Sequence, residues 1–235
     1  MDTRFCFSEK EFALLLEGSQ IKEYYGIGIA QCLNVKEEEI PKVIFQMIKK
    51  GLVQVKEQSY QMTEKVEQLF LAIREATKTI LIVSATRNQT MKCIYMGRRS
   101  IVVEYGGILH GLYKVYEKEW KTVIEEALQE EFEIAVLEKE QMVEMGIAQK
   151  CTIPKQEWIM RLQTQVAKKG VQVTENFTKD GLRILLELRN CEGKKRVFYL
   201  VEEPLENSVY WLEGDSVYKS ILLSEKILEL LQIDI

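Results

Sequence analysis

His110 is the only histidine in the sequence, so a general base or a metal site built on histidine would have to use it. Its surroundings predict a strand, and no serine or cysteine nucleophile and no acidic side chain that could orient the ring occurs within a few positions. We therefore interpret His110 as a structural strand residue and predict no catalytic residue. An enzyme that uses His110 within an ordered pocket is kept as an alternative.

Glycines and cysteines give no indication of a cofactor or metal site. Gly106, Gly107 and Gly111 match neither phosphate-loop spacing, and they do not lead from a strand directly into a helix. The five cysteines lie far apart and form no Cys-x-x-Cys pair: Cys6, Cys32, Cys93, Cys151 and Cys191. We predict reduced, mostly buried thiols, no metal and no cofactor.

The glutamates between Glu125 and Glu140 are a further candidate for chemistry, because paired carboxylates can act as acid and base. So dense a set on a predicted helix is more typical of a solvated face. No enzyme hypothesis rests on them.

The composition is that of a globular protein that stays in the cytoplasm. The chain has 235 residues, of which 46% are hydrophobic and 29% are charged, enough for one core or two smaller ones. Its net charge of −4 makes a nucleic-acid partner improbable, since counterion release requires a basic surface. The longest apolar runs fall far short of the roughly 20 residues that span a bilayer, and Met1–Phe7 shows no secretory signal.

The first part of the chain predicts a winged-helix-like unit. Ser8, with Glu11 three residues later, is a capping-box pattern that begins a helix, and a short helical turn follows around Ala30–Leu33. Asn34 begins a longer helix that tolerates Pro41 in its first turn and ends before Gly51. Its apolar residues follow helical spacing and predict one buried stripe: Ile40, Val43, Ile44, Met47 and Ile48.

A hairpin and a further helix complete this unit. Leu52–Lys56 and Tyr60–Met62 alternate like two strands, and Thr63 is predicted to cap a helix over Glu64–Ala76 with four residues facing inward: Val66, Leu69, Phe70 and Ile73. The exposed start of the longer helix carries three adjacent carboxylates, Glu37–Glu39, which would meet DNA phosphates with like charge. Protein contact is therefore favoured over DNA reading, and a winged-helix DNA-binding regulator with a partner- or ligand-sensing C-terminal part is the alternative function.

The remaining chain predicts two related sheets. After Ala76 the pattern changes to strands over Thr79–Ala85, Lys92–Met96, Ser100–Tyr105 and Ile108–Tyr116, followed by a helix near Glu119–Glu131. A shift of 104 positions places Ile80 on Ile184 and Tyr95 on Tyr199, which indicates an internal repeat. We predict an α+β protein of two related helix-plus-antiparallel-sheet units around a pseudo-twofold axis. The predicted parts are a winged-helix-like part over 1–77, a sheet and helix over 78–135, and a second, diverged unit over 136–235.

This order of elements resembles the EspG-type chaperones of ESX, or type VII, secretion systems. The similarity rests on a start ending in "KKGLVQV", the helix "TEKVEQLFLAI", a meander beginning "TILIVSA", a helix and a second diverged unit. The resemblance implies a cytoplasmic protein that is not an enzyme and that binds helical-hairpin secreted substrates, WXG100-like or similar, by their apolar tip. The composition departs from the Arg-, Ala- and Gly-rich mycobacterial members, which bears on the kind of substrate.

Carried over to this chain, the resemblance implies a partner-binding surface on the second unit. The predicted contact residues are Val209, Tyr210, Trp211, Leu212 and Trp158, with the helix over Gln156–Lys169 beside them. Aromatic residues of this kind anchor protein interfaces. A monomer or weak homodimer without membrane contact is expected.

Overall fold

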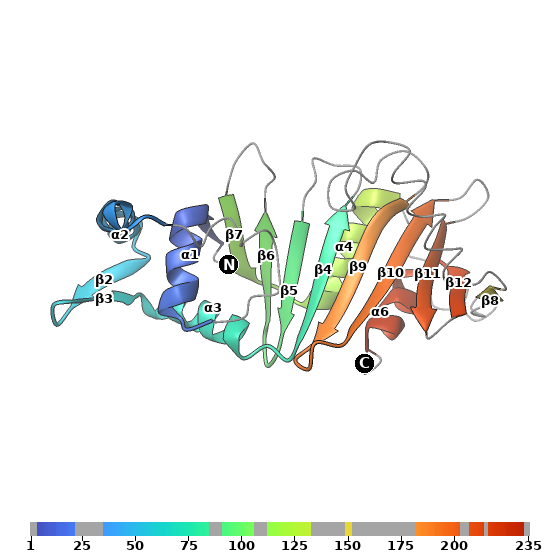
Figure 1. Ribbon diagram of the computed structural model, residues 1–235. Coiled ribbons are helices and arrows are strands. Elements are labelled where there is room, and N and C mark those ends of the chain that lie inside the picture. Colours follow the sequence, from blue (N-terminus) through green and yellow to red (C-terminus); the bar gives the residue numbers. More distant parts are fainter. Residues whose placement is uncertain are drawn as a thin grey trace. The chain divides into compact units, whose positions relative to one another are not determined.

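The structure, a computed structural model, describes residues 4–21, 35–84, 91–105, 112–132, 149–151, 182–202, 207–213 and 216–232. Its contacts divide the chain into two compact units. Unit 1 consists of Met1–Thr79 and Met91–Glu119, and unit 2 of Ile80–Thr90 and Trp120–Ile235. Each unit combines helices with antiparallel strands, so the predicted α+β class is confirmed (Figure 1).

In its described residues, unit 1 contains four neighbouring sheet strands, three α-helices and a separate hairpin. The sheet has the strand order β1-β7-β6-β5 with antiparallel neighbours. Helix α3 packs on β5, β6 and β7, while α1 packs on β1 and β7. The elements are β1 (Phe5–Ser8), α1 (Glu9–Gly18), the 3-10 turn η2 (Glu37–Glu39), α2 (Ile40–Lys49), β2 (Val53–Lys56), β3 (Ser59–Met62), α3 (Glu64–Arg74), β5 (Met91–Met96), β6 (Ser100–Tyr105) and β7 (Leu112–Glu117).

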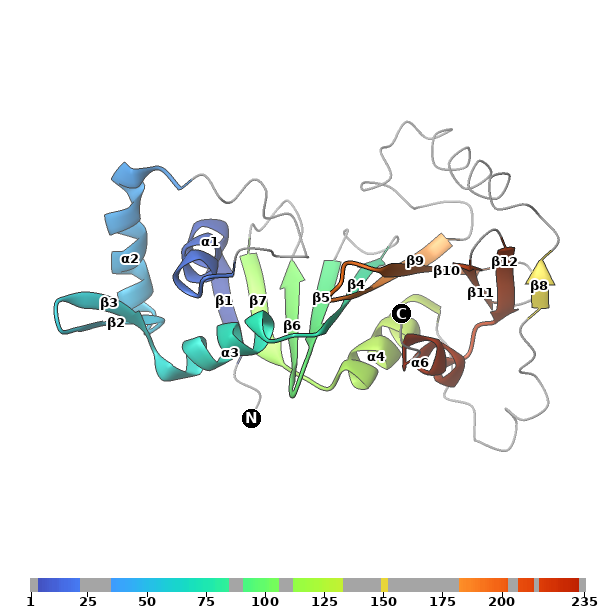
Figure 2. The same ribbon diagram turned by 60° about the horizontal axis from the view of Figure 1, so that its bottom comes forward.

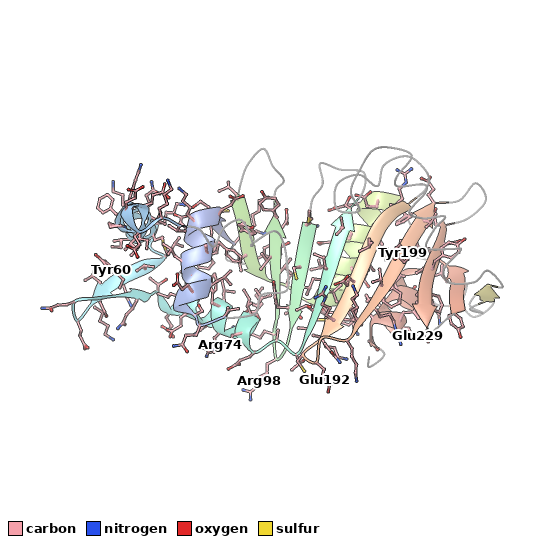
Figure 3. All side chains as sticks on the ribbon, in the orientation of Figure 1. Tyr60, Arg74, Arg98, Glu192, Tyr199 and Glu229 are labelled. Atoms are coloured by element: carbon pink, nitrogen blue, oxygen red, sulfur yellow. The ribbon has the colours of Figure 1, made fainter. Side chains whose placement is uncertain are left out.

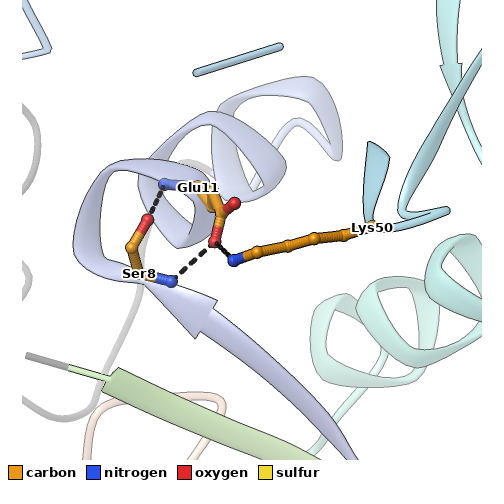
Figure 4. A network of polar contacts seen from close by, with 3 residues as sticks. All are labelled: Ser8, Glu11 and Lys50. Atoms are coloured by element: carbon orange, nitrogen blue, oxygen red, sulfur yellow. Dashed lines mark hydrogen bonds and ion pairs between the residues drawn. The ribbon is translucent and has the colours of Figure 1, made fainter. Parts of the chain in front are cut away.

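Helix α1 begins at the predicted capping box. Ser8 Oγ accepts a hydrogen bond of 3.3 Å from the Glu11 backbone N–H, and Glu11 Oε2 accepts one of 2.8 Å from the Ser8 backbone N–H (Figure 4). The same Glu11 oxygen lies 2.7 Å from Lys50 Nζ, at the end of α2. One buried carboxylate therefore ties the start of α1 to the end of α2.

The hairpin β2–β3 follows from two local features. Gly51 has a φ of +68°, which glycine adopts without steric cost, and it ends α2 as predicted. Glu57 and Gln58 have φ values of 49° and 63°, the backbone that a two-residue hairpin turn requires. Thr63 is the N-cap residue of α3, as predicted, but its hydroxyl makes no capping hydrogen bond and donates to the Gly51 carbonyl at 3.1 Å instead. This bond fixes the hairpin to the start of α3.

An aromatic cluster forms the core of unit 1. The Phe12 ring of α1 stacks on the Tyr113 ring of β7 with centroids 4.5 Å apart and an interplanar angle of 14°. Phe70 of α3 lies 5.6 Å from Phe12 and 5.9 Å from Phe7 of β1. All four side chains are at most 1% exposed. Offset and edge contacts of this kind add to the free energy that burial itself provides.

Among the residues that the structure describes, unit 2 contains six neighbouring strands and two helices. Its strand order is β4-β9-β10-β11-β12-β8, and α4 and α6 lie on one face of the β9–β11 strands (Figure 2). Helix α4 contacts β9 and α6. The elements are β4 (Lys78–Ser84), α4 (Trp120–Phe132), β8 (Gln149–Cys151), β9 (Leu182–Asn190), β10 (Lys195–Glu202), β11 (Asn207–Glu213), β12 (Ser216–Ile221) and α6 (Ser224–Gln232).

Alternate residues of these strands are buried, as one covered sheet face requires, and Ser208 of β11 is also buried although alternation places it on the other face. The buried apolar set in β9, β10 and β11 comprises Ile184, Leu186, Leu188, Phe198, Leu200, Val209 and Trp211. From α4, Val123, Ile124, Ala127 and Leu128 are buried, and from α6, Ile227, Leu230 and Leu231. These side chains form the apolar core of unit 2.

The observed bounds follow the 104-residue offset at several elements. Strand β7, Leu112–Glu117, corresponds to β12, Ser216–Ile221, and the start of β4 at Lys78 corresponds to the start of β9 at Leu182. The duplication itself, its pseudo-twofold axis and the winged-helix likeness stay predictions. The turn expected near Ala30–Leu33 lies outside the described residues, as does the cap Asn34.

Three other expectations differ from the structure. The sequence groups the helix after β7 with the first sheet because it follows that sheet in the chain, whereas the contacts of α4 lie in unit 2. The apolar stripe of α2 is only partly covered, since Val43 and Met47 are buried but Ile40, Ile44 and Ile48 are half-buried. Among the described cysteines Cys93 is buried, but Cys6 and Cys191 are exposed because they lie on the first strand and at a hairpin turn.

Candidate partner-binding surfaces

The predicted contact residues of β11 point to opposite faces of the sheet. Val209 and Trp211 are 0% and 4% exposed, so they belong to the core of unit 2 and offer no free surface. Tyr210, between them, is half-buried on the opposite face. Leu212 follows Trp211 in β11, and Trp158 lies outside the described residues. The predicted contact residues of β11 are continuous in sequence, but strand alternation places them on two different faces of the sheet.

The face of the unit 2 sheet opposite its buried core carries a row of apolar and aromatic residues. Leu185 of β9 is in register with Tyr199 of β10, and Tyr199 is in register with Tyr210 of β11. All three side chains are half-buried. We call Leu185, Tyr199 and Tyr210 the open sheet face.

Charged residues border this row. Glu187, two residues after Leu185 on the same face, forms an ion pair with Arg189 and lies 3.8 Å from Lys195 Nζ. Burial raises the pKa of the Tyr199 hydroxyl, and the Glu187 carboxylate raises it further because a nearby negative charge disfavours the phenolate. Tyr199 is therefore held as a neutral hydrogen-bonding group.

This shift predicts a loss of stability at high pH. The unfolded chain releases the tyrosine proton near pH 10, whereas the folded chain retains it to higher pH, so the contribution is present below about pH 10 and is lost as pH rises beyond it. In urea unfolding between about pH 8 and 11, the free energy of unfolding is expected to fall more steeply with pH for wild type than for Tyr199→Phe. For Glu187→Gln, the free energy of unfolding is expected to fall with an intermediate slope. Equal slopes for wild type and Tyr199→Phe would contradict the shift.

Unit 1 contains an apolar groove that the sequence did not indicate. The groove has a volume of about 870 Å³ and lies between α1, α2, α3 and the hairpin β2–β3. We call it the N-terminal groove; its apolar lining includes Leu14, Ile40, Ile44, Tyr60, Met62 and Leu71. Figure 3 labels Tyr60 on the hairpin and Arg74 near the end of α3. Two of the half-buried residues of α2, Ile40 and Ile44, thus form part of a groove wall, whereas Ile48 does not.

The only sequence feature that could have indicated this groove is the pair of apolar residues on the hairpin. Val55 and Tyr60 form a cross-strand pair on the hairpin and are 63% and 61% exposed. An alternating pattern predicts that one face of the hairpin is apolar. It does not predict what covers that face, because a two-stranded hairpin must pack against other elements of the fold.

Within the described ranges, no group of three or more His, Cys, Asp or Glu side chains is arranged to hold a metal ion. His110 lies outside those ranges. None of the helices that the structure describes combines the length and apolar character needed to cross a bilayer.

Comparison with known proteins gives a likeness of fold. Neither a protein-family profile nor a curated protein matches the sequence. Among solved structures, the chain is similar to the Mycobacterium tuberculosis type VII secretion system chaperone EspG5, solved in complex with the PE25–PPE41 dimer. The TM-score is 0.58 at 8% sequence identity, and the match covers 98% of this chain and 95% of that chain. The protein therefore has an EspG-like α+β fold.

Proposed function

We propose that the protein is a non-enzymatic cytoplasmic chaperone or adaptor that binds helical-hairpin secretion substrates, WXG100-like or similar, and shields their apolar tip. The observation that carries this proposal is the likeness to EspG5 over nearly the whole of both chains. EspG5 itself was solved bound to a PE25–PPE41 dimer.

The substrate would bind at the open sheet face, with Leu212 and Trp158 as further contacts. Leu185, Tyr199 and Tyr210 lie side by side across three strands. Aromatic side chains supply large contact areas at low entropic cost, and each Å² of apolar surface removed from water stabilises a complex by about 25 cal/mol. Val209 and Trp211 would act from beneath by holding β11 against the core.

Site-specific photo-crosslinking tests this proposal in the cell that produces the protein. A crosslinking amino acid at position 210 is expected to capture one predominantly helical protein, identified by mass spectrometry. The matched control is position 229, because Glu229 is exposed on α6, which covers the other face of the sheet (Figure 3). Capture should be at least about tenfold more frequent at 210 than at 229.

Reconstitution then tests shielding. The captured protein, purified alone, is expected to aggregate, and equimolar wild-type chain should suppress light scattering. Tyr210→Asp should fail to do so while keeping its own unfolding midpoint, because the half-buried position tolerates a charge better than the core does. A captured protein that stays in solution alone, or equal capture at positions 210 and 229, would contradict the proposal.

A further inference from the structure

Exposed apolar side chains occur at the N-terminal groove. Tyr60 and Leu71 line it and are 61% and 36% exposed, and Val55, the cross-strand neighbour of Tyr60 outside the lining, is 63% exposed. Single exposed apolar residues are ordinary, but several around a concave surface mark an interaction site.

The rim of the groove is acidic. Glu17 of α1 and Glu64 and Glu67 of α3 line it, and all three side chains are exposed. Neither Glu17 nor Glu67 forms an ion pair within the part of the chain that the structure describes. Arg74 is the basic side chain on this rim, and its Nη1 donates to the Ser19 carbonyl at 3.3 Å. Carboxylates around an apolar floor attract a partner that carries positive charge beside its apolar residues.

We propose that the N-terminal groove binds an amphipathic α-helix of a partner protein, with its apolar face in the groove and lysines or arginines along its borders facing Glu17, Glu64 and Glu67. The occupant is a helix because three of the groove walls are helices, whose backbone groups are already hydrogen-bonded. A helix satisfies its own backbone groups, whereas an extended peptide could pair only with a strand edge of the hairpin β2–β3 and would find no partners along the three helical walls. The groove then selects apolar anchors at positions i, i+3, i+4 and i+7.

This site differs from the open sheet face, and it does not rest on the proposed chaperone function. It lies wholly on unit 1, whereas the open sheet face lies on unit 2. Failure of one site in its own test leaves the other untouched.

Two synthetic peptides of about four helical turns test the proposal by fluorescence anisotropy. Both carry leucines at the anchor positions; one has lysines along the borders of its apolar face and the other has glutamates. The lysine peptide is expected to bind at least about tenfold more tightly at low ionic strength, and added salt should reduce this preference. Equal affinity of the two peptides, or no binding of either, would overturn the proposal.

A pair of neighbouring substitutions locates the binding. Ile44 lines the groove, whereas Phe45 is 57% exposed and outside its lining. Ile44→Asn is expected to weaken binding of the lysine peptide at least about tenfold, whereas Phe45→Asn is expected to weaken it by less than about twofold. Circular dichroism verifies the fold of both variants; should Ile44→Asn unfold, Leu71→Asn replaces it. Equal losses in the groove variant and in Phe45→Asn would show non-specific binding and overturn the proposal.

Charge reversal on the rim gives the sharpest outcome. The double variant Glu64→Lys and Glu67→Lys is expected to reverse the preference, so that the glutamate peptide binds more tightly. Glu57→Lys at the hairpin tip, outside the groove lining, should keep the wild-type preference. A concentration-dependent dimer in sedimentation equilibrium that Ile44→Asn abolishes and that neither peptide displaces would assign the groove to a second copy of the chain, against the proposal.

Discussion

Replacing Phe12 with alanine is expected to lower the free energy of unfolding of unit 1 by about 3–5 kcal/mol. Phe12 is fully buried, and its ring contacts those of Phe7, Phe70 and Tyr113, which come from a strand, a helix and another strand. The substitution removes the apolar transfer energy of the ring and leaves a cavity that three rings from different elements cannot easily fill. It therefore loosens the joint between α1, α3 and the sheet.

Phe45→Ala is the matched control for this experiment, since it removes the same side chain from an exposed position. The Phe45 ring is 57% exposed, and its described contact is Lys49 Nζ, 4.6 Å from the ring centroid. We expect a change within about 1 kcal/mol. Urea unfolding followed by circular dichroism measures both variants. Similar midpoint shifts for Phe12→Ala and Phe45→Ala would show that the aromatic cluster is not the core of unit 1.

Replacing Glu11 with alanine is expected to lower the free energy of unfolding by about 2–3 kcal/mol. The Glu11 carboxylate is 1% exposed and accepts hydrogen bonds from the Ser8 backbone N–H and from Lys50 Nζ (Figure 4). Its loss leaves the Ser8 N–H without its acceptor and removes the tie to α2. Because Lys50 is 47% exposed and stays hydrated, the ion pair contributes only part of this cost.

A glutamine at position 11 separates the contribution of the Ser8 hydrogen bond from that of the Lys50 ion pair. Glu11→Gln keeps an oxygen acceptor for the Ser8 N–H but loses the charge, so it should cost less than half as much as Glu11→Ala. Glu17→Ala on the same helix is the control, because Glu17 is exposed; we expect a change within about 0.5 kcal/mol. Urea midpoints measure all three variants. A Glu11→Ala midpoint equal to that of Glu17→Ala would refute the structural role of this carboxylate.

Local structure could be predicted from the sequence where short-range physics decides it. The capping box at Ser8, the hairpin turn at Glu57, the strand over Ser100–Tyr105 and the inward face of α3 all depend on residues within a few positions of one another. Helix caps and turn backbones are set by adjacent side chains and by glycine. Thr63 shows the limit: it occupies the predicted N-cap position, but its hydroxyl donates to a carbonyl twelve residues away rather than accepting from a backbone N–H of α3.

The candidate surfaces could be predicted only in part. The aromatic stretch of β11 was identified, but the sequence did not separate Tyr210 from Trp211, because both residue types suit a buried and an interfacial position. Burial of Trp211 depends on α4 and α6 covering one face of the sheet, which is a long-range event. The N-terminal groove likewise arises from four elements that are apart in the chain.

Residue patterns along the chain were enough to predict the kinds of elements, most of their bounds and the alternation that gives each strand one apolar face. Tertiary contacts determine which face is covered, which unit α4 packs in, and that Ile40 and Ile44 line a groove instead of a core. Periodicity and capping are encoded over one or two turns, whereas the burial of a given face depends on which distant apolar surface meets it.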